Sequence, residues 1–570
     1  MKKKFILYFT LGLVSLTGFT SCQGLLTQDS DQVLFAEDNK LDSPTDTVYS
    51  VIGIINLMQK VSDRTLLLGE IRGDLVSLTP DANVQLQQLA DFTSGTDNVY
   101  NAPEDYYAII NNCNYFIANA DTSLKKRNNP IFLKEYAVVK SFRAWTYLQL
   151  AQIYGSVPFV TEPILTEKQA SKVYEKKDIK AIAAYFIDDL KPYVTTPYPT
   201  YGSIGGFNPN LFFIPVKLLL GDLCLWDGRY KDAANYYHDF LTKGNVSQII
   251  SPKYTMGRVQ WYNKTNKFES LLDSYSSTFS TNSTEALWYI PMETSVFNGL
   301  LSDLPNIFNS TTANKYYFQA TYSRKLKELS KSQSNCLVYE NTLTSTRDTL
   351  YAPTVSLNNY SELLLGDLRL WSIYNSATIN SNNDYSSSYQ TISKFSFRNF
   401  YYRSAVIYLR YAEAMNRAGY PQSAFAVLKY GLTSANIGKY IDSTEIKSAG
   451  VLLDWDRNQF TAETTFGIHS KGSGDAAADK HYFLPKYTTL DSTMNFVEDK
   501  ISDEMALETA FEGHRFYDLI RITMRRNAND NTNNNDYLAS RVAGRKGAAY
   551  FNNDLYRTLR EPSNWYLPLK

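Results

Sequence analysis

Apolar residues follow a helical period through much of the chain, and in one segment they cover more than one side of the predicted helix. One stripe there contains Ala137, Ser141, Ala144, Leu148 and Ala151, and a second stripe beside it contains Val138, Phe142 and Trp145. A helix at the surface needs a single apolar stripe, so residues 140–154 are predicted to lie between neighbouring helices. Gly155 and Pro158 predict that this helix ends abruptly.

Two later segments, residues 218–241 and 408–432, share a spacing of small residues. Gly221, Gly228 and Ala233 in the first align with Ala412, Gly419 and Ala424 in the second. Small residues let the two helices of a hairpin approach closely, and the glycine permits the turn, which is the tetratricopeptide (TPR) pattern. With residues 140–155 and 177–190 as a further pair, the pattern predicts an all-α-dominated fold. Its TPR-like helical hairpins are expected at about 105–245 and 403–432 and stack into an α/α superhelix.

The segment between these helical regions, residues 246–400, has a different composition. It is rich in Ser, Asn, Thr and Tyr and contains short strand-like pieces such as residues 285–292. We expect a long irregular insertion with a few short strands, on the side that binds a ligand. Two low-complexity patches, residues 375–389 and 527–536, are predicted to be exposed mobile loops. Residues 46–570 are predicted to form a single body.

The first residues have the pattern of an export signal. Lys2–Lys4 form a basic start, a short apolar run follows, and small residues precede Cys22. This is typical of a secretory signal peptide, here residues 1–21. The residues before Cys22 also resemble the lipobox of bacterial lipoproteins, which implies cleavage before Cys22 and lipidation of its thiol. The alternative is that Cys22 lies by chance near an ordinary cleavage site. Residues 22–45 are predicted to be a flexible tether, so that the lipid anchor makes the only membrane contact.

Composition excludes several classes of function. Lys+Arg and Asp+Glu are equal at 57 each, so no net charge favours nucleic acid. The chain contains 44 Tyr, a residue suited to half-exposed recognition surfaces. The four histidines are scattered and the cysteines have no paired spacing, so neither a metal site nor a cofactor is predicted. No motif of a common hydrolase or phosphate-binding loop is present.

Three glutamates near the C-terminus are the best candidates for acid–base chemistry. Glu504, Glu508 and Glu512 recur every four residues and share one helical face. Glycoside hydrolases need carboxylates on opposite sides of a bond, which one helical face does not supply. We therefore interpret the three as part of a structural charge network, with Arg515 and Arg521 as nearby partners.

The same stretch resembles the SusD/RagB family of nutrient-uptake lipoproteins. The family pattern is Ile-x-x-Glu-Arg-x-x-Glu-Leu-x-Phe-Glu-Gly-x-Arg-x-x-Asp-Leu-x-Arg. The matching positions are Ile501, Glu504, Glu508, Phe511, Glu512, Gly513, Arg515, Asp518, Leu519 and Arg521, while Met505 and Thr509 depart from it. Residues 143–147, 154–158 and 564–569 match further family segments, and residues 501–570 are expected to form the C-terminal family segment. Residues 254–263 and 408–432 favour the RagB-like branch.

The resemblance implies a function in nutrient capture. Family members sit on the outer-membrane surface of Bacteroidota, and each covers a SusC/RagA-like TonB-dependent β-barrel transporter against which the TPR helices pack. The expected role is to capture an oligosaccharide and deliver it to that transporter, with no bond broken and no enzyme activity. Two alternatives stay open: the same role with peptide ligands, as in the RagB branch, and an exported glycoside hydrolase.

Following the family, the ligand site is expected on two segments, the early loop after residue 70 and the excursion after residue 250. Sugars place C–H faces against aromatic rings and pair their hydroxyls with polar side chains. The candidate ligand-binding residues are Asp74, Asn83 and Gln85 in the first segment and Trp261, Tyr316 and Tyr317 in the second.

Overall fold

The computed structural model describes residues 41 and 44–569 of the chain. Gaps fall at 127, 244–255, 264–267, 281–282, 298, 311–317, 342–343, 353–361, 381–385, 396, 456–465 and 531–534. The predicted signal peptide, Cys22 and nearly all of the predicted tether lie outside the described residues.

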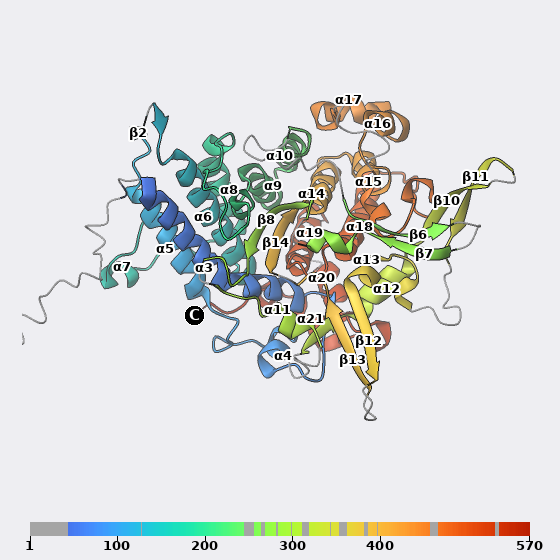
Figure 1. Cartoon of the computed structure of the whole chain (residues 1–570), viewed down its shortest axis with the longest axis horizontal. Helices are drawn as coiled ribbons and strands as arrows, with labels where there is room; N and C mark the ends of the chain where they lie inside the picture. Colours follow the sequence, from blue (N-terminus) through green and yellow to red (C-terminus); the bar gives the residue numbers. More distant parts are fainter. Residues whose placement is uncertain are drawn as a thin grey trace, which may run out of the picture.

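Helices dominate the described residues, as predicted, and most of the long ones lie side by side (Figure 1). The longer helices are α3 (Pro44–Ile71), α5 (Pro103–Asn119), α6 (Leu133–Tyr154), α8 (Ile179–Leu190), α9 (Val216–Asp227), α10 (Tyr230–Lys243), α14 (Ser404–Arg417), α15 (Pro421–Lys429), α18 (Leu490–Thr509) and α19 (Arg515–Asp530). The shorter ones are α4 (Val84–Ala90), α7 (Glu167–Ala170), α11 (Leu304–Phe308), α12 (Arg324–Ser332), α13 (Arg369–Ile373), α16 (Ser434–Tyr440), α17 (Ser443–Ala449), α20 (Asp536–Ala543) and α21 (Asn553–Leu559).

The long helices pack in a continuous series. Helix α5 lies against α3 and α6, α6 against α8, α8 against α9, and α9 against α10; α10 then packs on α14, which contacts α15 and α18. The two predicted hairpins, α9–α10 and α14–α15, are therefore neighbours although about 170 residues separate them. Their turn glycines, Gly228 and Gly419, have φ of 82° and 93°, which favours glycine.

Helix α6 shows why its sequence is apolar on every side. All of its residues from Ala137 to Tyr154 are buried, because α3, α5, α8 and α9 surround it. The helix ends at Gly155, where φ is 76° and the ring of Tyr566 lies where a side chain would be. The N–H of Leu567 donates to the carbonyl of Ile153 at 2.9 Å, so the C-terminal segment closes against the end of α6.

Strands within the described residues form seven two-stranded antiparallel sheets. The pairs are β1 (Val76–Leu78) with β9 (Ala320–Tyr322), β2 (Lys125–Lys126) with β3 (Asn129–Pro130), β4 (Val157–Pro158) with β5 (Lys176–Lys177), β6 (Val259–Asn263) with β7 (Phe268–Asp273), β8 (Ala286–Pro291) with β14 (Arg398–Arg403), β10 (Cys336–Asn341) with β11 (Thr346–Tyr351), and β12 (Tyr374–Asn380) with β13 (Ser386–Ile392).

One low-complexity patch differs from the prediction. Residues 375–389, predicted to be a mobile loop, supply most of the β12–β13 hairpin. Ladder hydrogen bonds use backbone groups, so a Ser- and Asn-rich sequence can form strands that hydrophobic periodicity does not reveal. In the second patch, residues 527–530 belong to α19.

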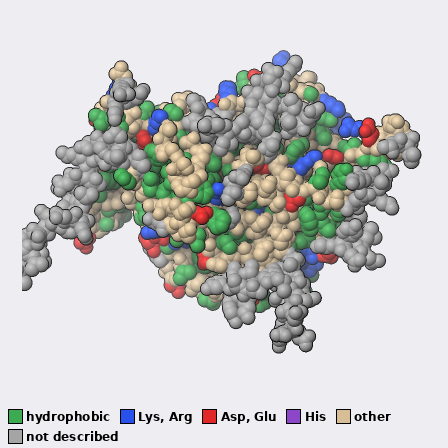
Figure 2. All heavy atoms as spheres, viewed as in Figure 1, with side chains coloured by type: hydrophobic (Ala, Val, Ile, Leu, Met, Phe, Trp, Pro, Cys, Tyr) green, Lys and Arg blue, Asp and Glu red, His purple; other side chains and the backbone are tan. Residues whose placement is uncertain are grey.

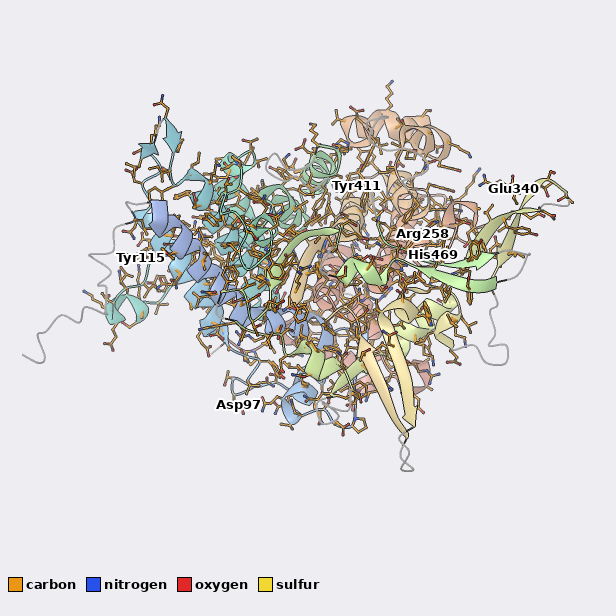
Figure 3. All side chains as sticks on the ribbon, in the orientation of Figure 1. Asp97, Tyr115, Arg258, Glu340, Tyr411 and His469 are labelled. Carbon is orange, nitrogen blue, oxygen red and sulfur yellow. The ribbon has the colours of Figure 1, made fainter. Side chains whose placement is uncertain are left out.

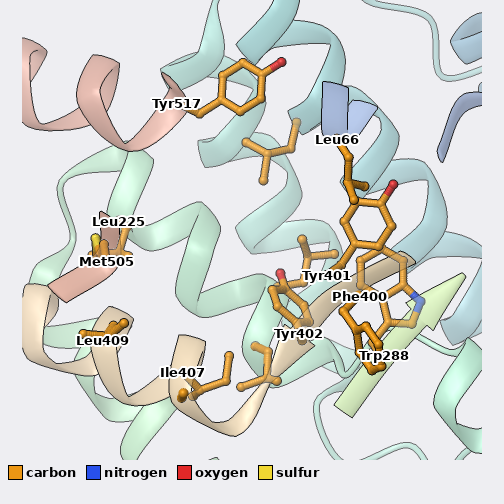
Figure 4. Packing of buried hydrophobic residues seen from close by; sticks show 14 of the residues in the cluster. Leu66, Leu225, Trp288, Phe400, Tyr401, Tyr402, Ile407, Leu409, Met505 and Tyr517 are labelled. Atoms are coloured by element: carbon orange, nitrogen blue, oxygen red, sulfur yellow. The ribbon is translucent and has the colours of Figure 1, made fainter. Parts of the chain in front are cut away.

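The buried sheet β8–β14 joins the insertion to the helical series. The ring of Trp288 on β8 stacks on Tyr401 of β14 at 4.7 Å between centroids, and the ring of Trp145 on α6 meets both edge-on at 5.2 Å. Figure 4 shows Trp288 and Tyr401 within the larger core. The stretch Pro209–Asp227 is long and apolar enough to cross a membrane, but 83% of its apolar window is buried inside the fold, so it is a core helix.

The backbone of α3 lies close to the backbone of Gly513, and this contact provides a test of the packing. A Cβ at Gly69 would lie 1.9 Å from the carbonyl oxygen of Gly513, whereas a Cβ at Gly53 in the same helix meets nothing within 4 Å. We expect Gly69→Ala to lower the free energy of unfolding by about 1 to 3 kcal/mol. Gly53→Ala should raise it by up to about 1 kcal/mol, because alanine favours a helix. Urea unfolding midpoints measure both, and equal effects of the two substitutions would contradict this packing.

Candidate ligand-binding surface

Two segments far apart in the sequence meet at the β1–β9 pair. Beyond the paired strands, the N–H of Thr79 donates to the carbonyl of Gln319 at 2.9 Å and its hydroxyl donates to the carbonyl of Phe318 at 2.6 Å. The N–H of Asn83 donates to Oε1 of Gln319 at 3.0 Å. The early loop and the later excursion therefore form one surface. We call residues 79–101, 299–309 and 318–322 the loop face.

Asp63 of α3 fixes the middle part of the loop face to the helical series. Its carboxylate accepts from the hydroxyl of Ser302 at 2.9 Å, the N–H of Asp303 at 2.6 Å and Nδ2 of Asn399 at 2.7 Å. Burial raises the pKa of Asp63 although these donors favour the charged form. This part of the loop face thus rests on a rigid helix, which favours a preformed site.

Asn83 and Gln85 lie on the loop face. The exposed Asn83 caps α4, where its side-chain oxygen accepts from the N–H of Leu86 at 2.9 Å. Oε1 of Gln85 accepts from the N–H of Val99 at 3.1 Å. Both amides thus use their oxygens to fix the loop. The side chain of Asn83 is also hydrogen-bonded to Tyr100, so the NH2 group of Gln85 is the one suited to a ligand.

Asp74 and Trp261 lie elsewhere. Asp74 is fully buried, and both of its carboxylate oxygens accept from Arg515, at 2.6 and 2.9 Å. Burial would raise the pKa of Asp74, but Arg515 outweighs it and holds the pKa below its ordinary value. Trp261 is 5% exposed on β6, which pairs with β7 and not with the loop face. Neither side chain lies on the loop face, and their predicted ligand roles stay predictions.

Tyr316, Tyr317 and Cys22 lie outside the described residues, so their predicted roles stay predictions. The loop face also contains polar groups that the sequence reasoning missed. The side chains of Tyr100 and Asn83 are hydrogen-bonded, Asp303 is exposed nearby, and Gln319 lies across the β1–β9 pair. Their positions depend on long-range pairing, for which the sequence holds no local signal. Asp97 marks this region beside α4 in Figure 3.

The three aligned glutamates take part in a buried charge network, as predicted. We call the following residues the buried ion network: Glu285, Asp367, Arg369, Lys394, Arg403, His469, Lys471, Glu504, Glu508 and Glu512. Each is at most 4% exposed. They come from segments before β8, at α13, after β13, at the end of β14, from residues 468–471 and from the C-terminal motif, residues 501–521.

Arg369 and Arg403 are the central partners of the three glutamates. Arg369 donates to Glu504 and Glu508 at 3.0 Å each, and Arg403 donates to Glu512 at 2.7 and 2.8 Å. Burial would raise the pKa of Glu508, but Lys471, Arg403 and Arg369 hold it well below its ordinary value. These carboxylates are ionised and engaged by fixed cations, which suits a structural role and not general acid catalysis.

The predicted partners Arg515 and Arg521 bind other acids. Arg515 binds Asp74, and Arg521 donates to Glu413 of α14 at 2.7 and 2.8 Å and to Asp518 at 2.8 Å. The motif therefore connects the network to β1 on one side and to a TPR-like hairpin on the other. Within the described part of the chain, the His, Cys, Asp and Glu side chains form no group of three or more that could hold a metal ion.

Comparison with known proteins agrees with this architecture. Residues 372–570 match the model of the SusD family. A SusD-like protein of Formosa agariphila is 24% identical over 187 residues, which cover 30% of this chain and about a third (34%) of that relative's length.

Three similar solved structures come from Bacteroides. A SusD superfamily protein of Bacteroides vulgatus covers 91% of this chain and 92% of its own, with a TM-score of 0.56 and 12% identity. A SusD-like carbohydrate binding protein of the same strain covers 84% of both chains, with a TM-score of 0.53 and 16% identity. A SusD-like carbohydrate binding protein of Bacteroides fragilis covers 84% of this chain and 86% of its own, with a TM-score of 0.53 and 14% identity. At these identities the likeness shows the fold.

The chain therefore resembles the SusD family in its C-terminal segment, residues 372–570, and in its fold. The RagB-like branch stays a prediction.

Breaking the buried ion network should destabilise the whole chain. Arg369→Met would leave Glu504, Glu508 and Asp367 with an uncompensated buried charge, and we expect a loss of about 3 to 5 kcal/mol in the free energy of unfolding. The matched control is Arg557→Met, which removes one of two charges that are 75% and 92% exposed. It should leave the urea midpoint unchanged. Equal midpoints for the two variants would show that the network contributes no stability.

A second buried acid predicts a pH dependence. Oε1 of Glu70 accepts from the N–H of Gly513 at 2.8 Å, and burial raises the pKa of Glu70 to about 7. The folded state therefore keeps a proton that the unfolded chain releases, and wild-type stability falls as pH rises from about 4.5 to about 7. Glu70→Gln cannot ionise. Its stability relative to wild type should therefore increase by about 2 to 3 kcal/mol between pH 5 and pH 8. A difference that stays constant across this range would contradict the raised pKa.

Proposed function

We propose that the chain is a lipid-anchored protein of the cell surface that captures an oligosaccharide on the loop face and delivers it to a TonB-dependent β-barrel transporter. The observation that carries the proposal is the loop face itself, in a protein that shares its fold with SusD-like carbohydrate binding proteins. The β1–β9 pair and Asp63 hold this surface on the helical series, which leaves its outer side chains available to a ligand.

The chemistry of the loop face suits sugars. Tyr100 offers a partly buried aromatic ring, and the amides of Asn83, Gln85 and Gln319 offer donors and acceptors at the same surface. A pyranose can place its C–H face on the ring while its hydroxyls replace water at the amides. Figure 2 shows Lys, Arg, Asp and Glu side chains scattered over one face of the molecule.

The anchor and the partner complete the proposal. Lipidation of Cys22, followed by a tether at residues 22–45, would hold the folded body beside the membrane, where acyl chains provide the affinity. The TPR-like helices would then pack on the transporter while the loop face meets ligand from outside. Peptide ligands, as in the RagB branch, are the alternative for the same surface.

Ligand binding tests the proposal. A chain that begins at residue 23 keeps every described residue and can be screened against glycan and peptide arrays. We expect retention of one group of related oligosaccharides. Tyr100→Ala should lower the affinity for these oligosaccharides about 10-fold, corresponding to about 1.4 kcal/mol, because the contact between the ring and the sugar is lost.

Tyr49→Ala is the matched control, because Tyr49 is 73% exposed near the other end of α3. It should leave affinity unchanged. Retention of peptides alone would mean that the ligand is a peptide and not a sugar. Failure to retain either class, or equal effects of the two tyrosine substitutions, would overturn the assignment to the loop face.

A further inference from the structure

A pocket lies between α12, α18, α20 and the segment after α20. Its volume is about 490 Å³, within the range of small-molecule sites. Figure 1 shows these three helices gathered in one region. The buried ion pair Asp74–Arg515 lines this pocket.

Two opposite charges line the pocket without partners. Asp503 of α18 and Lys325 of α12 both line it, and neither side chain makes an ion pair or a hydrogen bond with another described residue. Both side chains are partly buried. Elsewhere in the described interior, acids such as Glu508 and Asp518 are held by arginines. A carboxylate and an ammonium that share a pocket but do not pair leave room for a ligand between them.

The cations near Asp503 do not form an ion pair with it. Burial raises the pKa of Asp503 above its ordinary value, against the influence of Lys500, Arg515 and Arg541. Arg515 is occupied by Asp74, and Arg541 stacks 3.5 Å above the ring of Tyr537 and reaches Asp499 only at 3.4 Å. Arg541 also lines the pocket, so it can contribute a second cationic group beside Lys325.

Most of the remaining lining is apolar and comprises Leu75, Leu329, Ala548 and Phe551, with the small Gly544 beside them. Ser540 and Glu328 line it as well, and the carboxylate of Glu328 pairs with Arg324 at 2.7 Å. Phe551 is 37% exposed. The pocket therefore combines one unpaired anion, one unpaired cation and an apolar wall. A neutral sugar would leave the two charges without counter-ions, and an anion alone or a cation alone would satisfy only one of them.

We propose that this pocket binds a small zwitterion with an apolar side group, of the class of free α-amino acids. The ligand ammonium would pair with Asp503, its carboxylate with Lys325 and Arg541, and its side chain would lie against Leu329 and Phe551. This site goes beyond the proposed capture of oligosaccharide and uses other residues, so each of the two sites can fail without the other.

Calorimetric titration of the chain from residue 23 onward tests the site. The probes are the standard amino acids, followed by L-leucine, N-acetyl-L-leucine and L-leucinamide as a matched series. The second compound lacks the ammonium and the third lacks the carboxylate. We expect an apolar amino acid such as L-leucine to bind, and each of the two analogues to bind at least about 10-fold more weakly.

Substitutions assign the binding to the pocket. Asp503→Asn and, independently, Lys325→Gln should each weaken the binding of the amino acid at least about 10-fold. Asp97→Asn, at an exposed position of the loop face, should leave it unchanged. Glycan retention should be the same in the two pocket variants as in wild type.

Two results would contradict the proposed amino-acid site. One is that none of the standard amino acids binds in the millimolar range. The other is that L-leucine binds equally to wild type and to both pocket variants. Loss of glycan retention with intact amino-acid binding would overturn the loop-face proposal and leave this site standing.

Discussion

The rest of the structure depends on the pairing of Glu504, Glu508 and Glu512 with Arg369 and Arg403. A buried carboxylate is strongly destabilising unless a cation and enough donors surround it. Here the cations come from α13 and the end of β14, and each lies more than a hundred positions before the glutamates with which it pairs. The irregular insertion can therefore have only one arrangement relative to α18, because any other arrangement would leave these charges unpaired. The hydrophobic core supplies most of the stability, and the ion network determines which segments meet.

This constraint extends outward to the ligand side. Arg515 ties the motif to Asp74, directly before β1, and β1 pairs with β9 at the base of the loop face. On the other side, Arg521 and Asp518 connect the motif to Glu413 and Arg410 of α14. The motif thus lies between the TPR-like helices and the loop face. The charged positions of the family pattern are explained by structural contacts, without any direct role in binding.

The sequence predicted the helical part of this arrangement well, because the signals there are local. Gly221, Gly228 and Ala233 lie within one hairpin, and the two apolar stripes of α6 show burial on both sides. The site was much less predictable. Asn83 and Gln319 are 236 positions apart, and nothing near either residue indicates their contact. The spacing of the glutamates correctly indicated a charge network but could not identify Arg369 and Arg403. Asp74 was chosen as a ligand residue because it is an acid in the expected loop, although an arginine 441 positions away neutralises it. The β12–β13 hairpin was missed because backbone pairing leaves no trace in a Ser- and Asn-rich sequence.

The central claim is that a scaffold fixed by buried charges presents the loop face as a preformed capture surface. Amide hydrogen exchange, with and without a retained oligosaccharide, tests this claim most directly. The account predicts added protection in residues 79–101, 299–309 and 318–322, with unchanged and already slow exchange in α18 and β14. Protection that appears mainly along α8, α9 and α10, or a general slowing that includes α18, would contradict it. The first result would move the capture surface to the helices, and the second would mean that the scaffold becomes ordered only when ligand binds.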